Sequence, residues 1–151
     1  MFIPDLESGD LLLKRLELYN QFFIQVSLVQ KKGLDENKVA TERNILRTID
    51  QIESYLKTSL DEDPLLLVNF SPKVSEKDIS SWKDKAKLII ESYVRPSVNS
   101  YLEQLKIAHL PKGRSDTNPG IMWIEGGEDI YLRSLRKFTG NKDITVQEVH
   151  E

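Results

Sequence analysis

The sequence of 151 residues contains no cysteine and only two histidines. The lack of cysteine excludes disulfide bonds and thiolate zinc sites, and it fits both the cytoplasm and the periplasm. His109 and His150 do not form an HExxH pair, the spacing that places two imidazoles on one helix face around zinc. We therefore interpret both as surface or capping side chains, with His109 as a cation near a helix end, and expect no metal site in this chain.

Long apolar runs and excess positive charge are also missing. No apolar run reaches the roughly 18 residues of a transmembrane helix, and the first ten residues lack the basic and apolar regions of a signal peptide. The net charge of -3 and pI of about 5.5 give no basic field for nucleic acid. We expect no transmembrane segment and no nucleic-acid partner, and the compartment stays unknown.

The common catalytic motifs are absent. The sequence has no G-x-S-x-G elbow, no P-loop and no Gly-rich dinucleotide loop. The acidic run Asp61-Glu62-Asp63 lacks the Gly and Glu of a calcium loop, so we interpret it as a solvated loop. We assign no catalytic and no cofactor-binding residue from these motifs.

Apolar residues spaced three and four apart predict an all-α fold. A first amphipathic helix is expected over 10–32, capped by Ser8 or Asp10 and ended by Gly33. A second is expected from Asp35 to Lys57. The short connection predicts an antiparallel helical hairpin.

A connector and a long helix follow. "LLLVNF" (65–70) is expected to be either a buried extended stretch or a short helical turn. The capping box that starts at Ser75 predicts a long helix over about 76–108. Pro96 should kink this helix near Val94, because proline lacks a backbone donor and collides with the preceding turn. Three aromatic residues on it are more typical of a core than of a ligand stack: Trp82, Tyr93 and Tyr101.

The segment from Gly120 to Tyr131 allows two interpretations. "IMWI" (121–124) resembles a short strand, and Gly126-Gly127 should turn the chain into a helix over about 128–138, closed by a glycine. Free amides at such a helix start can bind an anion or a substrate carboxylate. A tight turn between packed elements is the favoured alternative.

The final residues contain a further capping box, Thr145-Val146-Gln147-Glu148. Only a few residues follow it, and so short a helix is marginal by itself. We expect residues 1–151 to be one helical region and a truncated part of a larger domain, although an ordinary frayed terminus would also explain the pattern.

Four ordered segments resemble a known family. They are "YVRPSVNSYLEQL" (93–105), "HLPKGR" (109–114), "GIMWIEGGEDIYLRSLRKFTG" (120–140) and "ITVQEVHE" (144–151). Together they resemble the bacterial family called domain of unknown function 885, most closely over 93–151 and more loosely before it. Three positions depart from the family pattern: Glu125, Gly140 and Val146.

The resemblance implies a larger, mostly helical fold of the zincin type. Complete members look like zinc-dependent metallopeptidases in which an HExxH helix lies downstream, zinc activates water and the motif glutamate acts as base. This implies that the present chain is the inactive segment before the zinc site and that zinc belongs to the parent. Four residues match motif positions and are candidates for lining or supporting a substrate cleft there: Tyr131, Arg136, Thr139 and His150.

Two functions are consistent with these patterns. The first is a helical segment of a zinc-dependent peptidase or hydrolase that acts on peptides, with the rest of the parent chain as its partner. The resemblance suggests that such parents are often exported or lipid-anchored. The alternative is a stand-alone, non-catalytic helical interaction module, dimeric through self-association.

Overall fold

The computed structural model describes residues 1–150, without the side chain of His150. It is 72% helical, which confirms the predicted all-α class, and has one small sheet of two strands. The strands β1 (Phe2–Ile3) and β2 (Asn69–Phe70) pair in parallel. The helices are α1 (Leu6–Glu17), α2 (Tyr19–Asp35), α3 (Glu42–Lys57), α4 (Glu76–Ile89), α5 (Arg95–Gln104), α6 (Gly127–Thr139) and α7 (Val146–His150).

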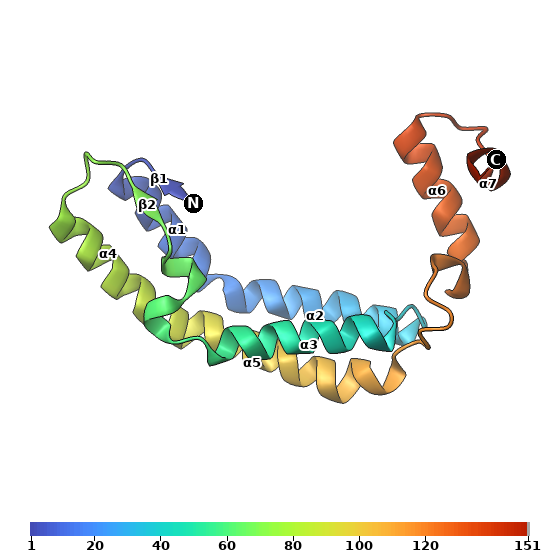
Figure 1. Ribbon diagram of the computed structural model, residues 1–151, viewed down its shortest axis with the longest axis horizontal. Coiled ribbons are helices and arrows are strands. Elements are labelled where there is room, and N and C mark those ends of the chain that lie inside the picture. The colour runs from blue at the N-terminus through green and yellow to red at the C-terminus, as the bar shows by residue number, and fades with distance from the viewer. Residues whose placement is uncertain (151) are drawn as a thin grey trace.

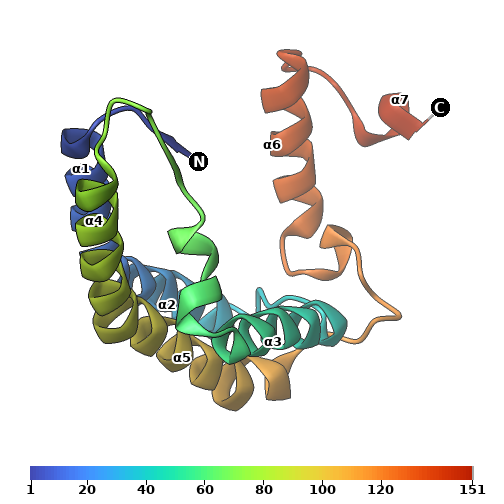
Figure 2. The ribbon, with the colours of Figure 1, turned by 60° about the vertical axis from the view of Figure 1, so that its left-hand side comes forward.

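The elements form a body with two arms (Figure 1). In the body, α2 and α3 run antiparallel, as the hairpin prediction requires, and both pack on α5. The N-terminal arm consists of α1, α4 and the strand pair, and the C-terminal arm consists of α6 and α7. Figure 2 shows that both arms rise on the same side of the body.

The predicted long helix is present and longer than expected. Residues 76–112 form one joined helix of 37 residues, in which α4 and α5 are linked by a π-helical turn (Ile90–Val94). A second π-helical segment (Leu105–His109) and a 3-10 turn (Leu110–Lys112) follow α5. Its start is capped as predicted, since Ser75 Oγ accepts a hydrogen bond from the Asp78 amide at 3.2 Å. Pro111 lies in this last 3-10 turn, one residue before the joined helix ends at Lys112.

The kink predicted near Val94 takes the form of the π-helical turn. Pro96, two residues after it, is inside the joined helix and supplies no amide donor to the preceding turn, which is where the helix widens into the π-helical turn. The Ser97 hydroxyl donates to the Tyr93 carbonyl at 2.6 Å, which satisfies a backbone acceptor at the irregular turn. The joined helix bends at this turn, and its two halves point in different directions (Figure 1).

The predicted first helix over 10–32 is wrong in its continuity and its cap. The chain forms two helices that meet at Leu18, and the first is capped by Asp5, whose carboxylate accepts from the Ser8 amide at 2.8 Å. No Gly or Pro marks Leu18. The break follows from tertiary packing, because α1 packs on α4 and α2 packs on α5, so the two helices must bend where the joined helix bends.

The connection between α2 and α3 also differs from the prediction. Gly33 lies inside α2, which ends at Asp35, and α3 begins at Glu42 rather than at Asp35. The intervening residues form a loop in which Asn37 has a left-handed φ of 55°. Asn tolerates this conformation, so Asn37, and not Gly33, was the residue in the sequence that indicated the turn.

Two buried clusters hold the fold together. The first joins the N-terminal arm to the bend and consists of Ile3, Leu13, Leu16, Leu66, Trp82, Ala86, Ile90, Val94 and Val98. The second holds the body together and consists of Val39, Ile45, Ile49, Leu102 and Leu105. Trp82 is in the core as predicted, Tyr101 packs against the second cluster, and Tyr93 is exposed, which corrects its assignment to the core.

The helical-turn interpretation of "LLLVNF" is correct for its start, and the extended interpretation is correct for its end, except that the extended residues Asn69 and Phe70 are exposed and half-buried rather than buried. Its first residues form a 3-10 turn (Pro64–Leu66), and its last two form β2. The strand-like prediction for "IMWI" is wrong, because Ile121–Trp123 form a 3-10 turn.

Candidate functional site

The C-terminal arm contains the motif positions selected from the sequence. α6 starts after Gly126 and ends before Gly140, and both glycines adopt left-handed φ values of 70° and 69°. This confirms the predicted turn into the helix and the glycine that closes it. The Gly127 amide donates to the Ile124 carbonyl at 2.7 Å, the geometry of a tight turn.

Tyr131 lies beside a cavity of about 640 Å³. The cavity is lined by Gly120, Ile121, Met122, Glu128, Tyr131 and Val146. Its wall therefore combines the 3-10 turn, the first half of α6 and the start of α7. Of the four candidates, Tyr131 is among the residues that line this cavity.

The other candidates lie elsewhere. Arg136 and Thr139 are exposed in the last turns of α6, about 12 Å along the helix from Tyr131 in the case of Thr139. The Thr139 hydroxyl donates to the Leu135 carbonyl at 2.7 Å, so it supports the helix end. The His150 side chain lies outside the described residues. The cavity at Tyr131 thus does not include Arg136 or Thr139.

The last capping box forms as predicted. The Thr145 amide donates to the Glu148 carboxylate at 2.8 Å, and the Glu148 amide donates back to the Thr145 hydroxyl at 3.3 Å. The hydrogen bonds that the Glu148 carboxylate accepts from the Thr145 amide and from the Thr145 hydroxyl lower the pKa of Glu148 below its ordinary value. The short α7 is therefore a locally capped turn beside α6.

A buried charge network lies where the sequence predicted a solvated loop. Asp63 is fully buried at 0% exposure and pairs with Arg95 at 3.0 Å. Arg95 also donates to the Thr58 carbonyl at 2.8 Å, and the Tyr55 hydroxyl donates to Asp63 at 3.1 Å. Burial, and then the negative charge of Asp63, raise the pKa of Tyr55 to about 12. The network joins the connector to the bend of the joined helix and is structural in its geometry.

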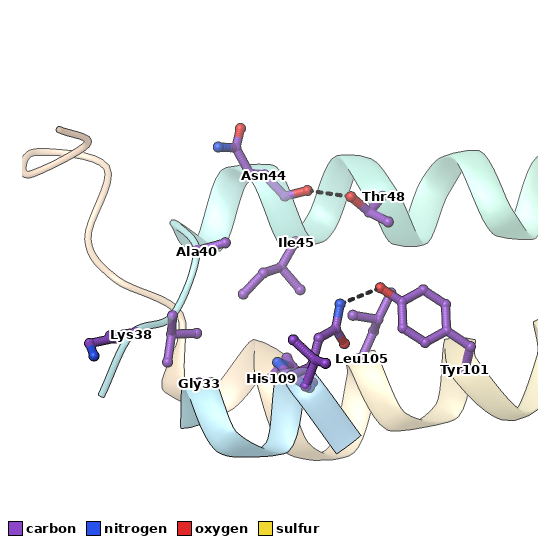
Figure 3. A pocket seen from close by; sticks show the side chains of 12 residues that line it. Gly33, Lys38, Ala40, Asn44, Ile45, Thr48, Tyr101, Leu105 and His109 are labelled. Atoms are coloured by element: carbon purple, nitrogen blue, oxygen red, sulfur yellow. Dashed lines mark hydrogen bonds between the residues drawn. The ribbon is translucent and has the colours of Figure 1, made fainter. Parts of the chain in front are cut away.

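His109 also differs from its sequence interpretation. It is 6% exposed, and burial lowers the pKa of its imidazole below the ordinary value, so it is not the exposed cation expected at a helix end. It lines a pocket of about 410 Å³ between the ends of α2, α3 and the joined helix (Figure 3). Its Nε2 atom is buried and has no hydrogen-bond partner among the described residues.

Arg114, in the "HLPKGR" segment, joins the body to the linker that leads to the C-terminal arm. Its guanidinium donates to the Val39 carbonyl at 2.6 Å and to the Asn118 carbonyl at 2.9 Å. Its backbone pairs with Thr41 as an isolated bridge. The side chain therefore holds the start of the linker against the loop between α2 and α3.

No metal centre is visible in the part of the chain that the structure describes: no three His, Asp or Glu side chains lie together there as a group that could hold an ion. Over the same residues, no helix is both long and apolar enough to cross a membrane.

The comparisons with known proteins give one match. The family model described as "Bacterial protein of unknown function (DUF885)" matches residues 1–151. The chain belongs to this family. The match includes the N-terminal arm and the body, where the sequence resemblance was loose. No curated protein and no solved structure matches the chain.

Because the chain belongs to DUF885, the places of its family-like segments in the structure are of interest. In this DUF885 chain the motif residues fall on three separate features: the bend at Pro96, the anchor at Arg114 and the arm that contains Tyr131. Within the described residues, these three features do not come together in one site.

Proposed function

We propose that this DUF885 chain is the helical segment of a larger zinc-dependent peptidase and is inactive by itself. The observation that carries the proposal is the C-terminal arm, which contains the family-like motifs yet exposes large apolar side chains. Trp123 is 55% exposed and Phe138 is 86% exposed. A single helix and a turn cannot bury such residues by themselves, and exposed apolar surface of this kind indicates contact with further protein.

In this proposal, residues 1–151 form part of a domain whose remaining elements cover the C-terminal arm. Tyr131, Arg136, Thr139 and His150 would then line or support a cleft for a peptide substrate. The described residues do not fit a zinc site, so the zinc and its HExxH ligands are assigned to another part of the parent, and the present chain takes no catalytic step.

The test compares the chain with the product of its whole reading frame. The chain alone should bind no zinc at equimolar ratio and should not cleave peptides, whereas the longer protein should do both. A longer protein in which Gln replaces the glutamate of HExxH is the matched control and should keep zinc but lose activity. A longer protein without zinc or peptidase activity would overturn the proposal.

A second function rests on the exposed surface of α2. No residue of this helix is fully buried, and Phe22 and Val29 are 60% and 72% exposed. These residues are seven apart and share one face of the helix. That surface favours a stand-alone helical interaction module that dimerises. The two functions differ in whether the longer protein, or a second copy of this chain, covers the apolar side chains.

A further inference from the structure

The pocket that contains His109 is a candidate binding site apart from the motif residues of the C-terminal arm. Its volume of about 410 Å³ is within the range of roughly 300–1,000 Å³ that is typical of small-ligand sites. Apolar walls come from Val39, Ile45 and Leu105, which are buried. Figure 3 shows Ile45 and Leu105 facing the interior, with Lys38 and Asn44 toward its edge.

Two of the residues that line this pocket each have a buried polar atom without a hydrogen-bond partner within the described residues. These atoms are Nε2 of His109 and Oε1 of Gln30. The other end of the Gln30 amide is fixed, since its Nε2 donates to the Tyr101 hydroxyl at 2.6 Å (Figure 3). Leaving buried polar groups unpaired costs about 1–3 kcal/mol each, so a molecule that pairs with both gains free energy from the site.

The charges around the pocket favour a neutral ligand. No carboxylate is among its lining residues, so the pocket offers no counterion to an ammonium group. The one cationic lining residue, Lys38, is paired with Glu36 at 2.7 Å, and Gln30 Oε1 can only accept a hydrogen bond. A ligand carboxylate would therefore lie against Gln30 Oε1, which is also an acceptor, and the Lys38 ammonium that could balance its charge is already paired with Glu36.

We propose that this pocket binds a neutral primary carboxamide that carries a short apolar group. The carboxamide N–H donates to Gln30 Oε1, and its carbonyl accepts from His109 Nε2–H. The apolar group packs on Val39, Ile45 and Leu105. Burial keeps the His109 imidazole neutral, which suits a donor to a carbonyl and is consistent with a neutral partner.

The test uses three probes of nearly equal shape: isovaleramide, isovalerate and isoamylamine. Their binding is followed through the His109 ring signals in NMR titrations of the 151-residue chain. Isovaleramide should bind saturably with a dissociation constant on the order of 1 mM, as befits so small a ligand, and the charged probes should bind at least about tenfold more weakly. Equal binding of all three probes, or none, would overturn the proposal; the latter is expected if the two atoms hold only a bridging water.

Single substitutions test whether the ligand binds to Gln30 and His109. Gln30→Leu and His109→Leu should each weaken isovaleramide binding about tenfold or more, while Gln51→Leu, an exposed Gln-to-Leu change on α3, should not alter it. Backbone amide signals report binding for His109→Leu. Unchanged affinity in Gln30→Leu would contradict the proposal even if the amide binds.

The same carboxamide group occurs in free amides and in Gln side chains of peptides. The blocked peptide N-acetyl-Ala-Gln-Ala-N-methylamide, compared with its Glu counterpart, separates these sources. Tighter binding of the Gln peptide than of isovaleramide supports a peptide as the ligand, and binding of isovaleramide alone supports a free amide.

Discussion

At the scale of single residues, the buried carboxylate of Asp63 gives the strongest prediction. It accepts from the Arg95 guanidinium, the Tyr55 hydroxyl and the Leu65 amide. Asp63→Asn leaves the Arg95 charge without its partner, so we expect the free energy of unfolding to fall by about 3–5 kcal/mol. Chemical denaturation with a constant m-value measures this loss.

The control lies in the same acidic run. Asp61 pairs with Lys87 at the surface, and its side chain is 80% exposed. Exposed ion pairs contribute little, so Asp61→Asn should leave the denaturation midpoint nearly unchanged. Equal effects of Asp61→Asn and Asp63→Asn would contradict the assigned burial.

His109 predicts how stability depends on pH. Burial lowers its pKa in the folded chain, while the unfolded chain keeps the ordinary value of 6.5. As pH falls below 6.5, the unfolded chain binds a proton that the folded chain does not, so the free energy of unfolding should decrease. The slope from this residue is at most about 1.4 kcal/mol per pH unit, and it disappears above the unfolded pKa because both states are then neutral.

Denaturation between about pH 7.5 and about pH 5.5 measures this slope. His109→Leu should remove it. Thr48→Val changes another wall of the same pocket without removing a titratable group, so it should retain the slope. A His109→Leu variant with the original pH dependence would show that His109 is accessible to protons in the folded chain.

Asp63 and His109 also show why such features escape a reading of the sequence. Three consecutive acidic residues are usually solvated, and the partner that holds Asp63 is 32 positions later at the bend. His109 ends a π-helical segment that rotates it toward the loop between α2 and α3, which no local pattern encodes. The burial of a polar residue depends on segments that are distant in the sequence. The caps at Ser75 and Thr145 depend only on residues up to three positions later, and both were predicted correctly.

At the scale of elements, local signals predicted helix ends better than helix breaks. The closing glycine of α6 and the proline-associated bend have local causes and were found from sequence. The break at Leu18 has none, since α1 and α2 bend only to follow the joined helix on which they pack. Tyr131 and Arg136 lie within the helix predicted over 128–138, and Thr139 lies one residue beyond its predicted end. The cavity beside Tyr131 also depends on the 3-10 turn and on α7, so it required the structure.

The turn before α6 predicts a local effect. A Cβ atom at Gly127 would lie 1.7 Å from the Ile121 carbonyl oxygen, far inside van der Waals contact. Gly127→Ala should therefore push the Ile121–Trp123 turn away from α6 and shift the NMR indole signal of Trp123, while the buried Trp82 signal stays in place.

Gly120→Ala is the matched control for this turn. Its Cβ would meet no atom closer than 3.6 Å, which is ordinary contact, so both indole signals should stay close to their original positions. Movement of the Trp82 signal in Gly127→Ala would contradict the separation of the C-terminal arm from the core of the N-terminal arm.

At the scale of the whole molecule, uncovered apolar surface predicts self-association of the isolated chain. Phe22 and Val29 on α2, and Met122 and Trp123 on the C-terminal arm, are all exposed. Sedimentation velocity should detect dimers or larger species, because burial of apolar surface favours association. A clean monomer at all accessible concentrations, with a cooperative transition at high temperature, would count against missing partner surfaces.

Variants identify which surface is responsible. The double variant Phe22→Ser with Val29→Ser tests α2, and Met122→Ser with Trp123→Ser tests the C-terminal arm. The double variant whose residues lie in the interface between copies should shift the sedimentation distribution toward monomer. Leu67→Ser changes an exposed apolar residue outside both surfaces and should have no effect. Dependence on α2 alone would favour the stand-alone module over the peptidase segment.

The most direct test of the central proposal is the coding sequence immediately 3′ of the Glu151 codon. We predict that the reading frame continues and reaches an HExxH motif. The polypeptide encoded after Glu151 would then cover the C-terminal arm. A stop codon directly after Glu151 would contradict the proposal. The exposed apolar surfaces would then not be covered by a C-terminal continuation of the chain, and the interaction module would be the remaining function.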